Sequence, residues 1–184
     1  GNVAKATSQN ISGGGSITGH DCTFAGLNSL ETIVVGDYPE ISQFSGLNND
    51  NIKTIKFGNV GSIGNSKFSS PAGGGVEYYS ILGKGLVSAE FEGVSELSQA
   101  AFKGLENLNY VDIGVVEEIP REAFSGCENL QHFDFSGVKS IGDYAFDGSG
   151  LLEVETGDLD RVGVNAFRNC KYLKTIKFGD IGEL

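Results

Sequence analysis

The stretch IPREAFSGCENLQHFDFSGVKSIGDYAF, residues 119–146, contains one short phrase twice. Ile, three further residues and then Ala-Phe occur at 119–124 and again at 141–146, so the chain returns to the phrase after 22 residues. Repetition with a period of about 20 to 50 residues is the sequence signature of a solenoid. Working outward from this stretch, the recurrent Phe falls at intervals of 20, 24, 34, 22, 22 and 21 residues, at Phe24, Phe44, Phe68, Phe102, Phe124, Phe146 and Phe167.

The apolar residues that follow each recurrent Phe repeat their spacing as well. Behind Phe124, apolar residues or Cys stand at offsets 3, 6, 9, 11, 14 and 17, and the same offsets recur behind Phe24, Phe102 and Phe167. The segment L-x-x-I-x-F alternates apolar and polar residues at its end, which predicts a strand buried on one side. A second short extended piece follows a Gly turn, and the short stretch around Ala-Phe predicts one helical or 3-10 turn.

One such unit cannot bury its own Phe and Leu, whereas stacked coils join them into a single core. We therefore predict an α/β solenoid of about seven coils of 20–24 residues, with parallel strands about 4.8 Å apart and an interior ladder of seven phenylalanines. Residues 1–16 form a polar, Gly-rich segment, and residues 17–184 form the solenoid. The 34-residue interval holds about twelve extra residues, which we expect to project from one coil as a loop at about 69–85.

Composition excludes several classes of partner. The formal net charge is −11 and no basic stripe is present, so the chain repels the phosphates of nucleic acids and anionic lipids. No run approaches the roughly 20 apolar residues that a membrane-spanning helix requires. Acidity leaves basic proteins or cations as the expected partners. Gly1 and the polar, Gly-rich residues after it are typical of the region behind a removed leader.

The phrases IPREAFSGCENLQHFDF (119–135) and VGVNAFRNCKYLKTIKF (162–178) share the pattern I-x-x-x-AF-x-x-C-x-x-L-x-x-I-x-F, with Val in place of the first Ile in the second. This pattern closely resembles the BspA-like class of bacterial leucine-rich repeats, and the resemblance covers about residues 17–184 apart from the insertion. It implies a right-handed leucine-rich-repeat superhelix in a secreted or lipid-anchored surface protein, of a kind implicated in adhesion to host or microbial surfaces. The family motif carries no catalytic residue, so the resemblance implies neither enzyme activity nor a cofactor.

Cysteines and histidines do not form a recognisable chemical site. The three cysteines, Cys22, Cys127 and Cys170, have neither a disulfide framework nor C-x-x-C spacing. Cys127 and Cys170 occupy the same offset two coils apart, which places them about 10 Å from each other and beyond the ~7 Å limit of a disulfide. We expect buried structural thiols. His132 stands at a solvent-facing strand position without a nucleophile beside it, and the glycine-rich pieces lack the Lys of a phosphate loop.

The repeat itself predicts a candidate binding surface. The residue between Ile and Phe of L-x-x-I-x-F faces outward, and this column reads Val34, Lys56, Glu90, Asp112, Asp134, Glu155 and Lys177. We call its four acids, Glu90, Asp112, Asp134 and Glu155, the acidic stripe. Carboxylates on rungs ~5 Å apart repel each other by about 1–3 kcal/mol per pair, and like charges side by side on a sheet are normally avoided.

Three interpretations of the acidic stripe remain open. It is a solvated acidic face, or a docking stripe for a basic partner with Tyr110 and His132 as flanking contacts, or a site where Ca²⁺ bridges the carboxylates. No D-x-D-x-D-G loop supplies the six to eight oxygens that Ca²⁺ takes, so we assign no metal ligand.

The insertion is the second candidate surface. Tyr78 and Tyr79, together with Ile81 and Leu82, are its most apolar stretch. Aromatic side chains on loops often anchor a binding partner. The alternative is that these residues fold back and cover the solenoid.

We therefore expect a non-enzymatic cell-surface module that binds an extracellular protein or glycan of basic character. The alternatives are a carbohydrate-active enzyme on a parallel β-helix-like solenoid and a structural envelope protein. The Ala-Phe turns and the lack of basic residues near the acidic stripe argue against the enzyme. The sequence ends in repeat register at IKFGDIGEL without a polar cap, so either the array continues or the last coil makes a weak edge contact with another molecule.

Overall fold

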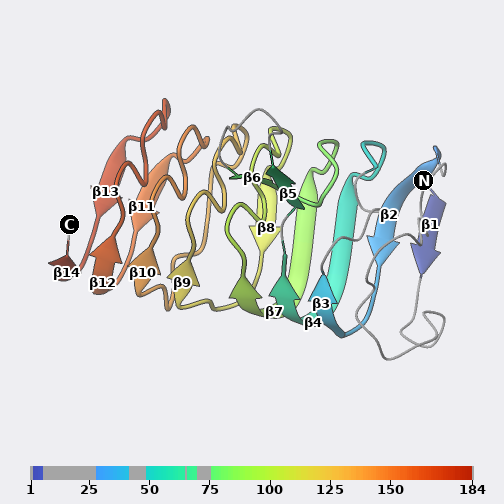
Figure 1. Cartoon of the computed structure of the whole chain (residues 1–184), viewed down its shortest axis with the longest axis horizontal. Coiled ribbons are helices and arrows are strands. Elements are labelled where there is room, and N and C mark those ends of the chain that lie inside the picture. Colours follow the sequence, from blue (N-terminus) through green and yellow to red (C-terminus); the bar gives the residue numbers. More distant parts are fainter. Residues whose placement is uncertain (1, 6–27, 42–48, 65, 70–75, 184) are drawn as a thin grey trace.

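The computed structural model describes residues 2–5, 28–41, 49–64, 66–69 and 76–183, and these form one row of stacked coils (Figure 1). Every strand pair in this part of the chain is parallel except β5 with β6. None of the described segments forms a helix with the length and apolar character that crossing a membrane requires. The strands are β1 (Asn2–Lys5), β2 (Leu30–Val34), β3 (Tyr38–Ile41), β4 (Thr54–Ile63), β5 (Ser66–Ser69), β6 (Val76–Tyr79), β7 (Ser88–Leu97), β8 (Tyr110–Asp112), β9 (Glu118–Ile119), β10 (Ser140–Ile141), β11 (Glu153–Glu155), β12 (Leu159–Val162), β13 (Thr175–Lys177) and β14 (Ile181–Glu183).

Each coil contributes to two strand faces. The first strand face consists of β1, β2, the N-terminal halves of β4 and β7, β8, and further along β11 with β13. The second strand face consists of β3, the C-terminal halves of β4 and β7, and the sheet of β9, β10, β12 and β14. The pairing of Thr54 with Ser88 has an offset of 34 residues, while Thr32 pairs with Thr54 and Ser88 with Tyr110 at 22. The long interval in the sequence is therefore an insertion between coils that stay in register.

The interior contains a row of stacked phenylalanines, as the sequence predicts for its C-terminal half. Ring centroids lie 5.0 Å apart between Phe102 and Phe124, 5.2 Å between Phe124 and Phe146, and 5.6 Å between Phe146 and Phe167. Alanines precede these rings and are buried with them, at Ala101, Ala123, Ala145 and Ala166. The coils thus stack on a shared aromatic core.

The predicted ladder of seven phenylalanines is wrong at Phe68. This residue lies on β5 in the antiparallel hairpin, outside the row of stacked rings. Toward the N-terminus the row continues instead with Phe91, edge-on to Phe102 at 6.4 Å, and with Phe57, stacked on Phe91 at 5.6 Å. Phe24 and Phe44 lie outside the described residues, and for the same reason the number of coils stays a prediction.

The predicted helical turn around Ala-Phe is not confirmed, and a chain of hydrogen-bonded turns occupies its place. In residues 120–127, Ala123 N donates to Pro120 O and Cys127 N donates to Phe124 O, which closes turns within the coil. Alternate amides, such as that of Phe124, donate instead to the next coil. The third residues of the two turns, Glu122 and Gly126, have φ of 57° and 75°. This left-handed geometry interrupts a helix and directs every second N–H along the solenoid.

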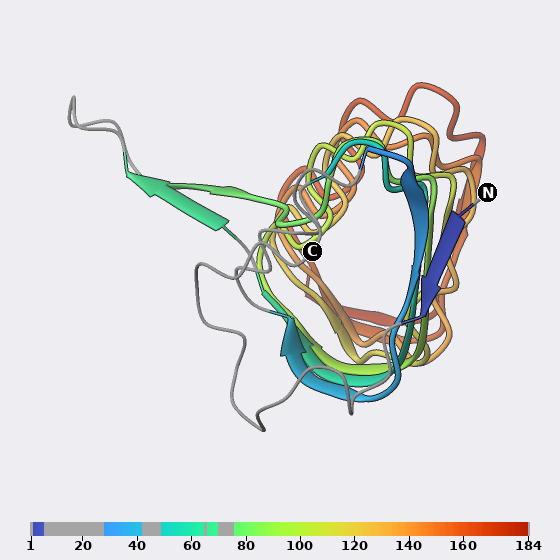
Figure 2. The ribbon, with the colours of Figure 1, turned by 90° about the vertical axis from the view of Figure 1, so that its right-hand side faces the viewer.

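The insertion forms a hairpin in which β5 pairs antiparallel with β6. Figure 2 shows this hairpin projecting from the solenoid, on the side away from β1 and β2. After the hairpin the chain returns to the core, because Ile81 and Leu82 are buried. The two halves of the apolar stretch therefore separate: Ile81 and Leu82 cover the solenoid, whereas Tyr78 and Tyr79 lie on β6. The contacts of the two tyrosine side chains fall outside the described residues.

Candidate binding surface

The acids of the acidic stripe lie on the first strand face. Glu90 on β7 is the register partner of Asp112 on β8. Leu152 N donates to Gln131 O, and this bond has the offset that places Asp134 beside Glu155 on the next coil. The parallel register thus carries the column of the sequence into space, as solenoid stacking requires.

Lysines neutralise both ends of the stripe. Lys56 Nζ lies 2.7 Å from Glu90 Oε2, and Lys177 Nζ lies 3.3 Å from Glu155 Oε2. Exposed ion pairs of this kind contribute about 0–1 kcal/mol to stability, so their main effect is on the local charge. Sequence reasoning missed this, although Lys56 and Lys177 stand in the same column as the acids. The negative charge is consequently centred on the middle of the stripe.

The middle of the stripe is a hollow of about 430 Å³. The structure brings four predicted site residues to it: Tyr110 and Asp112 from β8, and His132 and Asp134 from the next coil. We call this the central hollow. It forms where β8 ends at Asp112, because residues 131–136 of the next coil form no strand and leave the sheet open. Its other lining residues, which sequence reasoning did not single out, are Asn109, Val111, Ile113, Gly114 and Phe133.

Backbone hydrogen bonds fix the two carboxylates of the central hollow. Oδ1 of Asp112 accepts the N–H of Gly114 at 3.0 Å, and Oδ1 of Asp134 accepts the N–H of Ser136 at 2.8 Å. An aspartate that accepts the N–H two residues on closes an Asx turn, which explains how each strand ends here. Hydrogen bonds from the Ser136 hydroxyl and backbone lower the pKa of Asp134 below its ordinary value, since they favour the ionised form. Asp134 is therefore charged at neutral pH.

The central hollow lies within the part of the chain that matches a known family. The family model of the BspA type leucine rich repeat region matches residues 84–181 with six copies. The chain belongs to the BspA-type leucine-rich repeat family. No curated protein and no solved structure matches it. Leucine-rich repeats are generally non-enzymatic, and this type points to a surface module that binds protein, which favours the binding module over the carbohydrate-active enzyme.

The two candidate surfaces of the BspA-type repeat protein do not join. Asp112 and Asp134 lie on the first strand face, and the β5–β6 hairpin that carries Tyr78 and Tyr79 projects from the opposite side of the solenoid (Figure 2). A small ligand therefore cannot contact both. Binding through the two tyrosines stays a prediction, separate from binding at the central hollow.

The cysteines of the BspA-type repeats act as interior residues. The thiol of Cys127 donates to Phe102 O of the preceding coil at 3.2 Å, and burial raises its pKa to about 12. Cys170 makes the equivalent bond to Phe146 O at 3.1 Å, and Ser149 Oγ lies 3.3 Å from its sulfur. Both thiols are free, and the prediction of structural thiols is confirmed for these two. Cys22 lies outside the described residues.

A metal site would require several ligands in one place. Among the residues with described positions, no group of three or more His, Cys, Asp or Glu has an arrangement that could hold a metal ion. Bridging of the stripe by Ca²⁺ therefore stays a prediction, with the pair Asp112 and Asp134 as its remaining location.

Proposed function

We propose that this BspA-type repeat protein is a non-enzymatic cell-surface binding module, which holds a basic segment of an extracellular protein in the central hollow. The observation that carries the proposal is the pair of carboxylates of Asp112 and Asp134 in one hollow, where neither forms an ion pair with a described residue. Their lysine-paired neighbours confine the charge to this point of the stripe. A Lys or Arg side chain of a partner supplies the missing cation.

Rigidity favours a docking site over a solvated face. Freely solvated carboxylates splay apart and rotate, whereas Asp112 and Asp134 are each held by an amide two residues on. Groups that are fixed before binding lose less conformational entropy when the partner arrives. Tyr110 is 51 % exposed beside them, and an exposed aromatic ring attracts a cationic side chain through its face.

The setting of the module follows from the family and from the resemblance of the sequence. We place the protein outside the cell, secreted or attached to the cell surface, with a lipid anchor in a removed N-terminal region as one form of attachment. Its role there is adhesion to a host or microbial surface. The complete array in this proposal is a right-handed superhelix of about seven coils, as solenoids built from such repeats form.

Binding of basic proteins to paired variants tests the proposal. We would immobilise poly-lysine and a panel of extracellular-matrix proteins, and measure affinity for the wild type, Asp112→Asn/Asp134→Asn and the control Glu106→Gln/Glu128→Gln. Asn retains the oxygen that accepts the turn hydrogen bond, and the control removes two exposed charges away from the hollow. We expect the first variant to bind about tenfold more weakly than both other proteins. Equal affinity of all three proteins would remove the central hollow from the function.

A further inference from the structure

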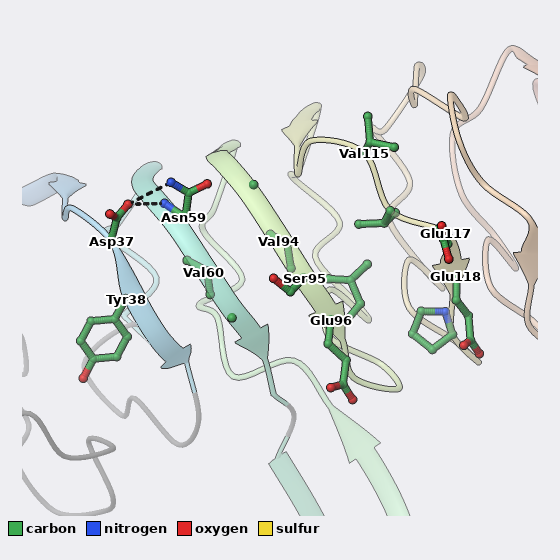
Figure 3. A pocket seen from close by; sticks show the side chains of 15 residues that line it. Asp37, Tyr38, Asn59, Val60, Val94, Ser95, Glu96, Val115, Glu117 and Glu118 are labelled. Atoms are coloured by element: carbon green, nitrogen blue, oxygen red, sulfur yellow. Dashed lines mark hydrogen bonds between the residues drawn. The ribbon is translucent and has the colours of Figure 1, made fainter.

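A second, larger hollow of about 920 Å³ lies on the second strand face (Figure 3). It extends over β3, the C-terminal halves of β4 and β7, and the segment that leads into β9. We call it the glycine groove, because Gly61 and Gly93 form its floor together with Ser95. None of its lining residues belongs to the acidic stripe or to the central hollow, so its occupancy does not depend on the function proposed above.

Small residues in neighbouring coils create the groove. The outward position that is Glu117 and Lys139 in later coils is Gly61 on β4 and Ser95 on β7. Gly93 is the register partner of Asn59, and a Cβ built on Gly93 would lie only 3.1 Å from Asn59 Oδ1. Such a contact is tight, so this position suits a glycine. Two neighbouring strands therefore present nearly bare backbone to the solvent.

The groove has an aromatic end and an aliphatic end. Tyr38, half-buried on β3, stands at the N-terminal end, and Val115 stands at the other end (Figure 3). Val115 is 71 % exposed, and its Cγ1 lies over Gly137 of the next coil, where an added Cβ would come within 2.4 Å. The glycine thus gives the exposed valine a fixed resting place. Both ends offer apolar contact to a chain lying between them.

Four carboxylates line the glycine groove, and its lining contains no Lys or Arg. Asp37 Oδ1 accepts the backbone N–H of Asn59 at 2.7 Å and its side-chain amide at 3.2 Å, which holds that carboxylate at the groove. Glu96, Glu117 and Glu118 form no ion pair with any described residue. The charge therefore lies at both ends of an otherwise neutral floor.

We propose that the glycine groove binds an extended basic peptide, in which Lys or Arg alternates with small or aliphatic residues. Charge complementarity selects this occupant: a neutral glycan leaves the carboxylates without partners, and an anionic glycan is repelled. The groove crosses four neighbouring coils, a span of about 14 Å at ~4.8 Å per strand, which matches roughly four residues of extended chain. Small residues of the peptide lie over Gly61 and Gly93, and its cations reach Asp37 at one end and Glu96 and Glu117 at the other.

Fluorescence anisotropy of a defined probe tests this proposal. The probe is the labelled peptide Lys-Val-Lys-Gly-Lys, blocked at both ends, with Glu-Val-Glu-Gly-Glu as the charge-reversed probe. Ser95→Trp places a large ring over the floor, and Glu96→Gln/Glu117→Gln removes two charges without changing shape. The control for lost charge is Glu106→Gln/Glu128→Gln, and Asp112→Asn/Asp134→Asn reports binding at the central hollow.

We expect both groove variants to bind the lysine peptide about tenfold more weakly than the wild type, with the two other variants unchanged. The glutamate peptide should not bind. Equal weakening by Glu106→Gln/Glu128→Gln would show attraction to net charge alone, and weakening by Asp112→Asn/Asp134→Asn alone would place the peptide in the central hollow; either result overturns the proposal. Equal binding of a neutral N-acetylglucosamine tetrasaccharide, measured by calorimetry, would also overturn it. Because the Gln variant is isosteric, the test holds even if Ser95→Trp does not fold.

Discussion

The rings of Phe102 and Phe124 lie parallel, with an angle of 6° between their planes and 5.0 Å between their centroids, although 22 residues of chain separate them. Phe146 repeats the relationship one coil further, and all three rings are fully buried. Each lap of the chain therefore delivers the same side chain to the same place. This regularity is what positions the outward-facing side chains of successive coils beside one another.

Replacing Phe124 with Ala should lower the free energy of unfolding by about 3–5 kcal/mol, because the ring is buried between two others and its removal leaves a cavity. Urea unfolding followed by circular dichroism measures the change. Phe68→Ala is the matched control, since β5 lies in the projecting hairpin, and it should cost much less. A loss at Phe68 as large as that at Phe124 would contradict the arrangement.

Removing the two lysines that end the acidic stripe should strengthen binding of a basic partner. Lys56→Gln/Lys177→Gln frees Glu90 and Glu155 from their ion pairs, so four carboxylates attract a cationic chain instead of two. We expect poly-lysine to bind about three- to tenfold more tightly at low salt, with the gain lost as salt screens the charges. Lys84→Gln/Lys171→Gln changes the net charge equally at exposed positions elsewhere. Equal gains from both variants would show that net charge alone decides.

Acid should weaken both the fold and the binding through Asp134. Hydrogen bonds from Ser136 lower the pKa of Asp134 below 3.8 in the folded protein, so its contribution to stability is complete above the ordinary pKa and is lost as the pH falls through the lowered value. The difference in unfolding free energy between wild type and Asp134→Asn should be constant above about pH 5 and shrink toward about pH 2. Denaturant titrations across this range measure it. A difference that shrinks with rising pH would contradict the assignment.

The thiol of Cys127 should resist modification in the folded protein. Burial raises its pKa to about 12, so almost no thiolate exists at about pH 8, and the stabilisation is lost only as the pH rises above 9.0 toward that value. In a Cys22→Ser background, a thiol reagent should leave Cys127 unlabelled and react slowly with half-buried Cys170, whose pKa burial also raises. Peptide mapping by mass spectrometry reads the two sites. Labelling of Cys127 as fast as in denaturant would contradict its burial.

The sequence predicts the repeat, the parallel coils and the aromatic row, because each depends on a pattern that stacking must satisfy in every lap. It is misleading at Phe68, where Phe alone matches. The coils that stack in the described core have Ala before Phe, whereas Phe68 follows Lys67, and this difference was the available signal. The helical turn could not be excluded from sequence, because left-handed Glu122 is not a glycine and is held by bonds to the neighbouring coil.

The candidate sites were predictable in part. The register of the repeat brings Asp112 and Asp134 to one surface, and the same column already contains Lys56 and Lys177, whose side chains are long enough to reach the adjacent rung. The central hollow itself depends on where β8 stops, which the pattern of apolar residues does not determine. The glycine groove depends on small residues at one outward position in two neighbouring coils, and it becomes visible only when the coils are placed side by side.

Disulfide trapping across the stripe tests most directly whether successive coils stack in this register. Parallel neighbours lie about 4.8 Å apart, within the range of a disulfide, and a second coil lies at roughly 10 Å, beyond it. In a Cys22→Ser/Cys170→Ser background, with buried Cys127 retained, Glu90→Cys/Asp112→Cys should form an intramolecular disulfide on mild oxidation. Glu90→Cys/Asp134→Cys should remain reduced. A disulfide in the second pair and none in the first would contradict the stacking on which both candidate sites depend.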